Sequence, residues 1–127
     1  MAQVDVASSD ITVAGRFPLG DGKWLIYGKL QGPNTSETSG SEISCDVARG
    51  QWGVTQIHAM WITAGAVAAY STGFIAPVFQ PVNDGTTCGT IHWFTYDPTA
   101  GAATGLTTEL AATDLSTYYW PFIALAT

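Results

Sequence analysis

The chain has 127 residues, which is enough for one domain and too short for two domains of ordinary size. Charged residues make up 11% of the sequence, against about 25% in typical globular proteins, and the formal net charge is -6. We expect no nucleic acid partner, because the four basic residues form no stripe that would neutralise phosphates. The 14 glycines, with abundant Thr, Ser and Ala, indicate an all-β domain with many turns.

The first residues show neither the basic nor the apolar region of a secretory signal peptide, so we expect a protein that is not exported by that route. Residues 59–79 carry no charge over 21 positions, a length that would span a bilayer. Ala, Gly, Ser and Thr dilute this segment, Pro77 lies near its end, and no Lys or Arg flanks it closely. We therefore expect strands here and no membrane partner.

The N-terminal third of the sequence predicts an arm, a hairpin and a loop. Residues 1–9 are small and polar and are expected to form an extended arm ahead of a single domain, residues 10–127. Alternating apolar residues predict strands at 11–17 and 23–31, and the Pro, Gly and Asp residues between them predict the turn of an antiparallel hairpin. Residues 32–44, rich in Gly, Ser and Thr, are expected to form an exposed, mobile loop.

Further strands are predicted in the middle of the chain. Alternation over residues 54–63 predicts a central strand, and residues 66–82 are expected to form one or two strands. The Asn-Asp-Gly sequence at 83–85 predicts a hairpin turn before a strand at 88–97 that carries large residues on both faces. We expect that strand in the middle of a sheet or against a second subunit, because both of its faces need to be covered.

The C-terminal part completes the expected fold. Residues 108–116 are the only predicted helix, and it is short because apolar residues are sparse there. Residues 117–127 are predicted to form a closing edge strand, because Pro121 interrupts the alternation and cannot donate to a sheet ladder. Short strands separated by turns predict an all-β fold, a single antiparallel β-sandwich or jelly roll, with a small β-barrel as the second choice.

Few His or Cys residues in the sequence suit catalysis or metal binding. His58 and His92 lie between apolar neighbours in predicted strands, which favours core or interface positions over acid–base catalysis. Cys45 and Cys88 lack the close ligand pairs of structural zinc sites. We expect free thiols in a reducing compartment, with one Cys45–Cys88 bridge as the alternative if the fold brings their Cα atoms within about 7 Å. We expect no metal or other cofactor.

The acidic residues show no catalytic or calcium-binding pattern. Glu37 and Glu42 lie in a predicted loop with no apolar pocket to separate their pKa values. Asp84, Asp97 and Asp114 lack the spacing of a calcium-binding loop, and no nucleophile elbow or nucleotide fingerprint occurs. We therefore expect a protein that is not an enzyme, and a small hydrolase that uses one of the two histidines is the third hypothesis.

Aromatic residues and missing charges point to a contact surface. Residues 50–83 contain no Asp, Glu, Lys or Arg, and residues 85–96 form a second charge-free stretch. Protein interfaces are depleted of charge at their centres and enriched in Trp and Tyr. An aromatic-rich core and a sugar-stacking platform are the alternatives. The aromatic residues that we expect at protein contacts are Trp52, Trp61, Trp93, Tyr118, Tyr119 and Trp120.

Three stretches of the sequence carry a resemblance to a known group of proteins. They are Ser-Gly-Ser-Glu-Ile at 39–43, Phe-Thr-Tyr-Asp-Pro-Thr-Ala-Gly at 94–101, and residues 109–116. On these residues the chain resembles the small head-decoration, or cement, proteins of tailed bacteriophages of the marine and cyanobacterial type. The resemblance implies a non-enzymatic virion protein, made in the host cytoplasm, that binds the major capsid protein and forms a homo-oligomer, a trimer ahead of a dimer.

Two function hypotheses of different classes follow. The first is a structural β-sandwich subunit that docks on a capsid or a similar shell through the arm and the charge-free strands. The second is a carbohydrate-binding or receptor-binding module, such as the tip of a tail fibre.

Overall fold

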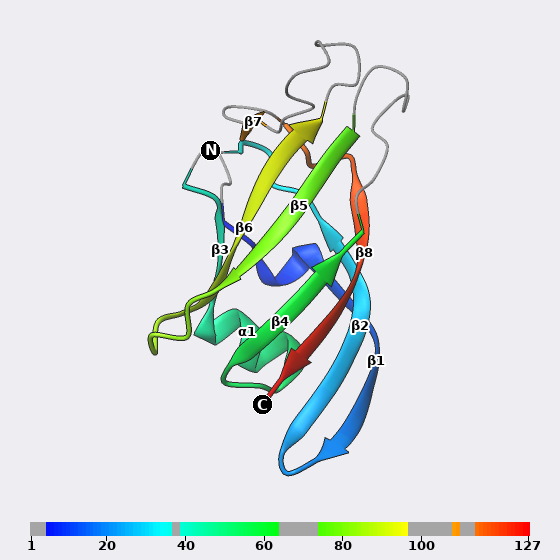
Figure 1. Cartoon of the computed structure of the whole chain (residues 1–127), viewed down its shortest axis with the longest axis vertical. Coiled ribbons are helices and arrows are strands. Elements are labelled where there is room, and N and C mark those ends of the chain that lie inside the picture. Colours follow the sequence, from blue (N-terminus) through cyan, green and yellow to red (C-terminus); the bar gives the residue numbers. More distant parts are fainter. Residues whose placement is uncertain (1–4, 37–38, 64–73, 97–107, 110–113) are drawn as a thin grey trace.

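The computed structural model describes residues 5–36, 39–63, 74–96, 108–109 and 114–127. They form two facing antiparallel sheets, which confirms the all-β, sandwich-like fold (Figure 1). The first sheet has the strand order β1 (Ile11–Gly20), β2 (Lys23–Gln31), β8 (Tyr119–Ala126) and β4 (Ile57–Ile62). The second sheet has the order β3 (Ser41–Ser44), β6 (Thr87–Tyr96) and β5 (Phe74–Pro81), and β7 (Thr108–Glu109) also pairs with β6.

The helix α1 (Cys45–Trp52) lies where the sequence predicts none. Ser44 caps its start, because the Ser44 Oγ accepts a hydrogen bond from the Val47 amide at 3.1 Å. Gly53, with a φ of 67°, ends it in the left-handed conformation. The helix predicted at 108–116 is wrong at its start, because Thr108–Glu109 is β7, and residues 110–113 lie outside the described residues.

Both α1 and the 3-10 helix η1 (Ser8–Asp10) close one side of the sandwich. The helix α1 contacts β1 of the first sheet, β3 and β6 of the second sheet, and η1. On the other side of the sandwich, β4 and β5 lie next to each other without pairing as one ladder (Figure 1). The core therefore fills the space between the two sheets and extends under α1.

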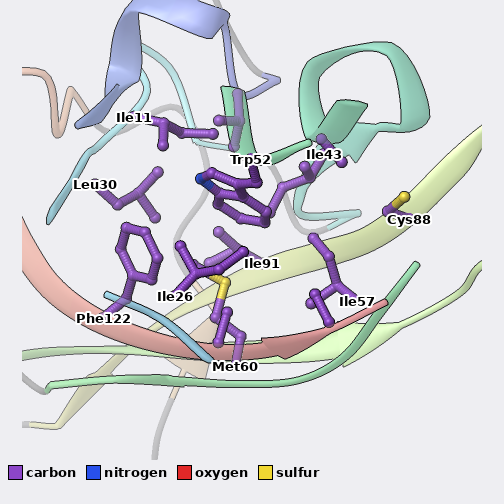
Figure 2. Packing of buried hydrophobic residues seen from close by; sticks show 14 of the residues in the cluster. Ile11, Ile26, Leu30, Ile43, Trp52, Ile57, Met60, Cys88, Ile91 and Phe122 are labelled. Atoms are coloured by element: carbon purple, nitrogen blue, oxygen red, sulfur yellow. The ribbon is translucent and has the colours of Figure 1, made fainter. Parts of the chain in front are cut away.

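The core is rich in tryptophan and isoleucine. The indole of Trp52, on α1, lies among Ile26, Ile43 and Phe122 (Figure 2). Its ring centroid is 5.5 Å from that of Phe122. The other large side chains that are almost completely buried are Trp93, Trp120, Leu30, Ile57, Ile91 and Leu115.

Strand β8 is a central strand of the first sheet, so the prediction of an edge strand is wrong. Its burial alternates strictly at first, with Trp120 and Phe122 inside and Pro121 and Ile123 outside. In antiparallel pairing the N–H and C=O of one residue point to the same side. The Pro121 carbonyl accepts a hydrogen bond from the Thr63 amide at 3.1 Å, so the missing N–H faces the side where β4 has just ended. Pro121 therefore removes few of the main-chain hydrogen bonds between β8 and its neighbouring strands.

Strand β4 was expected to be central and lies instead at an edge of the first sheet. A register shift between Ile57 and Ala59 breaks the predicted alternation, so that Ile57 and Met60 are both buried. Asn83, in the β5–β6 turn, ties the start of this strand to the second sheet. Its Oδ1 accepts from the Ile57 amide at 3.0 Å and its Nδ2 donates to the Ile57 carbonyl at 2.9 Å.

In their described parts, the predicted extended arm and the predicted exposed loop are packed on the domain. In the described part of the N-terminal arm, Val6 is buried and its amide donates to the Glu42 carbonyl at 3.0 Å. In the predicted mobile loop, Ser36 is buried and residues 41–44 form β3. The prediction of an exposed loop over residues 32–44 is therefore wrong for most of its described residues. The hairpins β1–β2 and β5–β6, with their predicted turns, are confirmed.

Candidate interaction surface

Three of the six predicted contact aromatics lie inside the core. Trp52, Trp93 and Trp120 are buried within the single chain, so their side chains cannot reach a partner on the outside. The rings of Trp93 and Trp120 are 4.9 Å apart, and the Trp93 Nε1 donates to the buried Ser41 Oγ at 2.9 Å. The aromatic-rich core, one of the alternatives, is thus correct for these three residues. Tyr118 is half-buried and packs against the core, 6.1 Å from the Trp120 ring.

The other two predicted aromatics, Trp61 and Tyr119, lie on the outer face of the first sheet. There the strand register places Tyr27, Ile123 and Trp61 side by side across β2, β8 and β4. Their exposed fractions are 39%, 46% and 60%. Three large apolar side chains in adjacent positions of one sheet face form a continuous apolar row in contact with solvent.

A second row extends the apolar surface toward the β1–β2 turn. Leu25 and Leu125 are in register, and Phe17 lies opposite Leu25 on β1. Phe17 is exposed, and its ring stacks on that of Tyr27 with centroids 5.8 Å apart and planes 11° apart. We call the outer face formed by the two rows and Pro121 the apolar face; its members are Phe17, Leu25, Tyr27, Ala59, Trp61, Pro121, Ile123 and Leu125.

Among the described residues, the charged side chains that border this face lie at the two ends of β2. The alternation of β2 puts Lys23 and Lys29 on the same side as Leu25 and Tyr27, one lysine at each end. The Lys29 Nζ lies 5.3 Å from the centroid of the Tyr119 ring, which suits a cation–π contact. The apolar face is thus flanked by positive charge, although the protein as a whole has a net charge of -6.

Two shallow depressions open beside Pro121 on this face. One, of about 390 Å³, is lined by Trp61, Ile62, Thr63, Pro121, Phe122 and Ile123. The other, of about 300 Å³, is lined by Thr12, Ala14, Tyr27, Gly28, Lys29 and Pro121. Both linings are mainly apolar, so each depression fits an apolar side chain better than a charged or strongly hydrated group.

The outer face of the second sheet is different. There the register places Gln80, Thr90 and Glu42 side by side across β5, β6 and β3. On the same face, the His92 Nε2 lies 3.1 Å from the Gln80 Oε1. Among the described residues of this face, Val78 is exposed and Phe94, next to His92, is half-buried. Polar groups therefore line the middle of this surface, as is usual for a sheet that faces water.

The residues considered for catalysis or metal binding do not come together. The His58 Nε2 lies 3.0 Å from the Thr127 Oγ1, in an exposed position, so a core position is wrong for His58 and an interface position stays a prediction. In the described part of the chain, no three His, Cys, Asp or Glu side chains are close enough to bind one metal ion. Glu37 and Asp97 lie outside the described residues.

The described aspartates considered for calcium bind their own turns. The Asp84 Oδ1 accepts from the amides of Thr87 and Thr86, and these hydrogen bonds lower the pKa of its carboxyl. The Asp114 Oδ1 accepts from the Oγ and the amide of Ser116, which lowers the pKa of that carboxyl. Both carboxylates therefore have structural hydrogen bonds that account for their positions.

Comparison with known protein families, curated proteins and solved structures finds no match to this chain. Among the described residues, no helix is long and apolar enough to cross a membrane.

Sequence reasoning missed part of the apolar face. It did not single out Phe17, Tyr27 or Ile123 as contact residues, although the alternation of β2 was read correctly. The available signal was that β2 and β8 carry large apolar residues on both faces, because such strands need a cover on each side. That signal was assigned only to β6.

Proposed function

We propose that this protein is a non-enzymatic structural protein that docks on the outside of a virus capsid and reinforces the contacts between major capsid subunits. The observation that carries the proposal is the exposed row of Tyr27, Ile123 and Trp61 in the middle of the apolar face. A contiguous apolar patch of this kind marks a protein contact site. The resemblance of the sequence to phage decoration proteins supports the choice of a capsid as the partner.

The arrangement of charge on the face suits a protein partner. Interface centres are apolar and poor in charge, and their rims are polar. Here Lys23 and Lys29 stand at the rim, so the complementary surface is an apolar patch flanked by carboxylates. Burial of one exposed large apolar side chain contributes up to about 1.5–3 kcal/mol before the costs of association are subtracted.

Several copies that bind together would make a weak individual contact long-lived. We propose that the protein acts as a homo-oligomer, a trimer ahead of a dimer, whose copies engage several shell subunits at once. Linked contacts raise the effective affinity without any new interaction. In this proposal the mature protein resides on the virion surface, and its partner is the major capsid protein or a similar shell protein.

A carbohydrate-binding module is the second candidate, and one observation favours it. Among the described residues, Trp61 is the most exposed large hydrophobic residue, and it lies beside the larger of the two depressions, where an indole face is accessible for stacking on a sugar ring. Sugar sites also need hydrogen-bonding side chains to orient the hydroxyl groups. Among the described residues of that lining, the polar side-chain groups are the Thr63 hydroxyl and the Trp61 indole N–H, so the depression suits an apolar anchor better.

The docking face is tested with two matched variants. Ile123→Lys places a charge in the centre of the apolar face, and Val78→Lys places one at an equally exposed position on the other sheet. We expect Val78→Lys to co-sediment with capsids that lack the protein as well as the unmodified chain does. Ile123→Lys should bind at least about 100-fold more weakly, the size expected for an interface hot spot.

Three outcomes would contradict the proposal. Equal binding of both variants would show that the apolar face is not the docking site. Capsids whose resistance to heat and osmotic shock is the same with and without the protein would rule out reinforcement. Saturable quenching of tryptophan fluorescence by a glycan, without capsid binding, would favour the carbohydrate-binding module.

A further inference from the structure

Two free thiols lie against each other in the core, although they are 43 residues apart in sequence. Cys45 is the first residue of α1, and Cys88 lies on β6. Their Sγ atoms are 3.3 Å apart, and both residues are buried. The sequence predicts free thiols, as the structure shows, but the spacing of the two residues gives no indication that they meet.

The local backbone explains why they meet. The register of β3 with β6 pairs Ile43 with Gly89 and Ser44 with Thr87, so that Cys88 is left over as the extra residue of a β-bulge. A bulge of this kind redirects a side chain. Directly after Ser44 the chain turns into α1, and the Cys45 amide donates to the Thr86 carbonyl at 2.9 Å. The two cysteines are therefore held beside each other by main-chain pairing.

The surroundings keep the Cys88 group in the thiol form near neutral pH. Burial, followed by the contact with Cys45, raises the pKa of the Cys88 thiol to about 12. The Cys88 Sγ is also 3.3 Å from the Thr55 carbonyl oxygen, an acceptor for the S–H. A catalytic cysteine needs the opposite environment, one that favours the thiolate. Nor do other metal-ligating side chains in the described residues join the pair.

We propose that Cys45 and Cys88 form a latent cross-link, a pair of thiols that a small peroxide oxidises to an intramolecular disulfide. The required movement is small, since the S–S bond of a disulfide is roughly 2.05 Å long. A peroxide is small enough to reach a buried pair during local opening of the first turn of α1. The proposal stands on the Sγ–Sγ contact and is independent of the capsid function.

The reaction balances with hydrogen peroxide as the oxidant. One sulfur, as its thiolate, attacks a peroxide oxygen; the O–O bond breaks, hydroxide leaves and takes up a proton to give water, and a sulfenic acid remains. The second sulfur attacks the sulfenic sulfur and loses its proton, and the S–O bond breaks with release of a second water. Two thiols and one peroxide thus give one disulfide and two waters.

The cross-link would join α1 to β6 and close a long loop. A disulfide stabilises a protein mainly by restricting the unfolded chain, and the restriction grows with the length of the loop. For the separation of 43 residues we expect the melting temperature to rise by about 10 °C. A thiol reductant should reverse the rise.

The test uses the full chain treated with hydrogen peroxide at pH 8. We expect the intact mass to fall by two hydrogens, the titratable thiols of the denatured protein to fall from two to zero, and a peptide pair containing residues 45 and 88 to appear. The melting temperature should rise with the cross-link. The rate should increase with pH, because the thiolate is the reactive form.

Two controls make the result decisive. Cys45→Ser and, separately, Cys88→Ala cannot form the bridge, and we expect neither to show the rise in melting temperature after treatment. Thiols that stay titratable, sulfonic acids without a cross-link, or disulfides only between two chains would each overturn the proposal. The mass of the peroxide-treated chain without substitutions decides the test by itself. A variant that fails to fold therefore does not weaken the test.

Discussion

The outer faces of the two sheets differ although their strands follow the same alternation. The first sheet presents Tyr27, Ile123 and Trp61 in one cross-strand row, whereas the second presents Gln80, Thr90 and Glu42. Both sheets bury the opposite face in one shared core. The difference shows that core packing accounts for only one side of β2 and β8, and that the other side is suited to a further contact.

The largest expected effect is a difference in the free energy of unfolding between variants of Trp93, which is buried under the second sheet, and of Trp61, which lies on the apolar face. Trp93→Ala removes a fully buried ring and the hydrogen bond to Ser41, so it should lower the free energy of unfolding by about 3–5 kcal/mol. Trp61→Ala removes an exposed ring and should change it by no more than about 0.5 kcal/mol. Urea denaturation measures both; similar losses would mean that Trp61 belongs to the core.

A smaller, spectroscopic effect sharpens the same contrast. Because Trp61 is exposed while Trp52, Trp93 and Trp120 are buried, Trp61→Phe should shift the emission maximum to shorter wavelength and reduce quenching by acrylamide. The matched control is Trp24→Phe, since the Trp24 ring is half-buried with the Arg16 guanidinium 4.0 Å from its centroid. If Trp24→Phe changed the emission maximum and the acrylamide quenching as much as Trp61→Phe or more, Trp61 would not be the exposed indole.

The smallest effect concerns the turn of the second sheet. Hydrogen bonds from Thr87 and Thr86 lower the pKa of Asp84, so this carboxylate stabilises the fold above its unfolded pKa. That contribution is lost as the pH falls through the lower, folded pKa. Asp84→Asn should therefore show a weaker loss of melting temperature on acidification, and Asp21→Asn, in the β1–β2 turn, is the control. An unchanged pH profile for Asp84→Asn would contradict this assignment.

Local signals predicted the hairpins correctly. The turn-forming residues before Lys23 and the Asn-Asp-Gly sequence at 83–85 specify their backbone conformations, since Asp21 and Asn83 both have positive φ. The middle position of β6 was also predicted correctly from its large residues on both faces. Hairpin turns depend on residues that are neighbours in sequence, and the middle position of a strand is indicated by large residues on both of its faces. Both signals can be read from the sequence alone.

The errors arose where distant segments decide the structure. Pro121 indicated an edge strand, but its missing N–H falls just beyond the end of β4, which depends on residues 58 positions away. The short helix α1 has a clear Ser44 cap but no long apolar stripe. Trp93 and Trp120 were assigned to a partner because alternation shows that a residue faces one side without showing which side is covered.

Strands β4 and β5 lie next to each other without pairing, and the side chain of Asn83 provides hydrogen bonds between the two sheets there. Its amide satisfies both the N–H and the C=O of Ile57, so one side chain joins the second sheet to the first residue of β4. Asn83 therefore fixes the position of the first residue of β4 relative to the β5–β6 turn, an alignment that no pairing between the described strands of the two sheets provides.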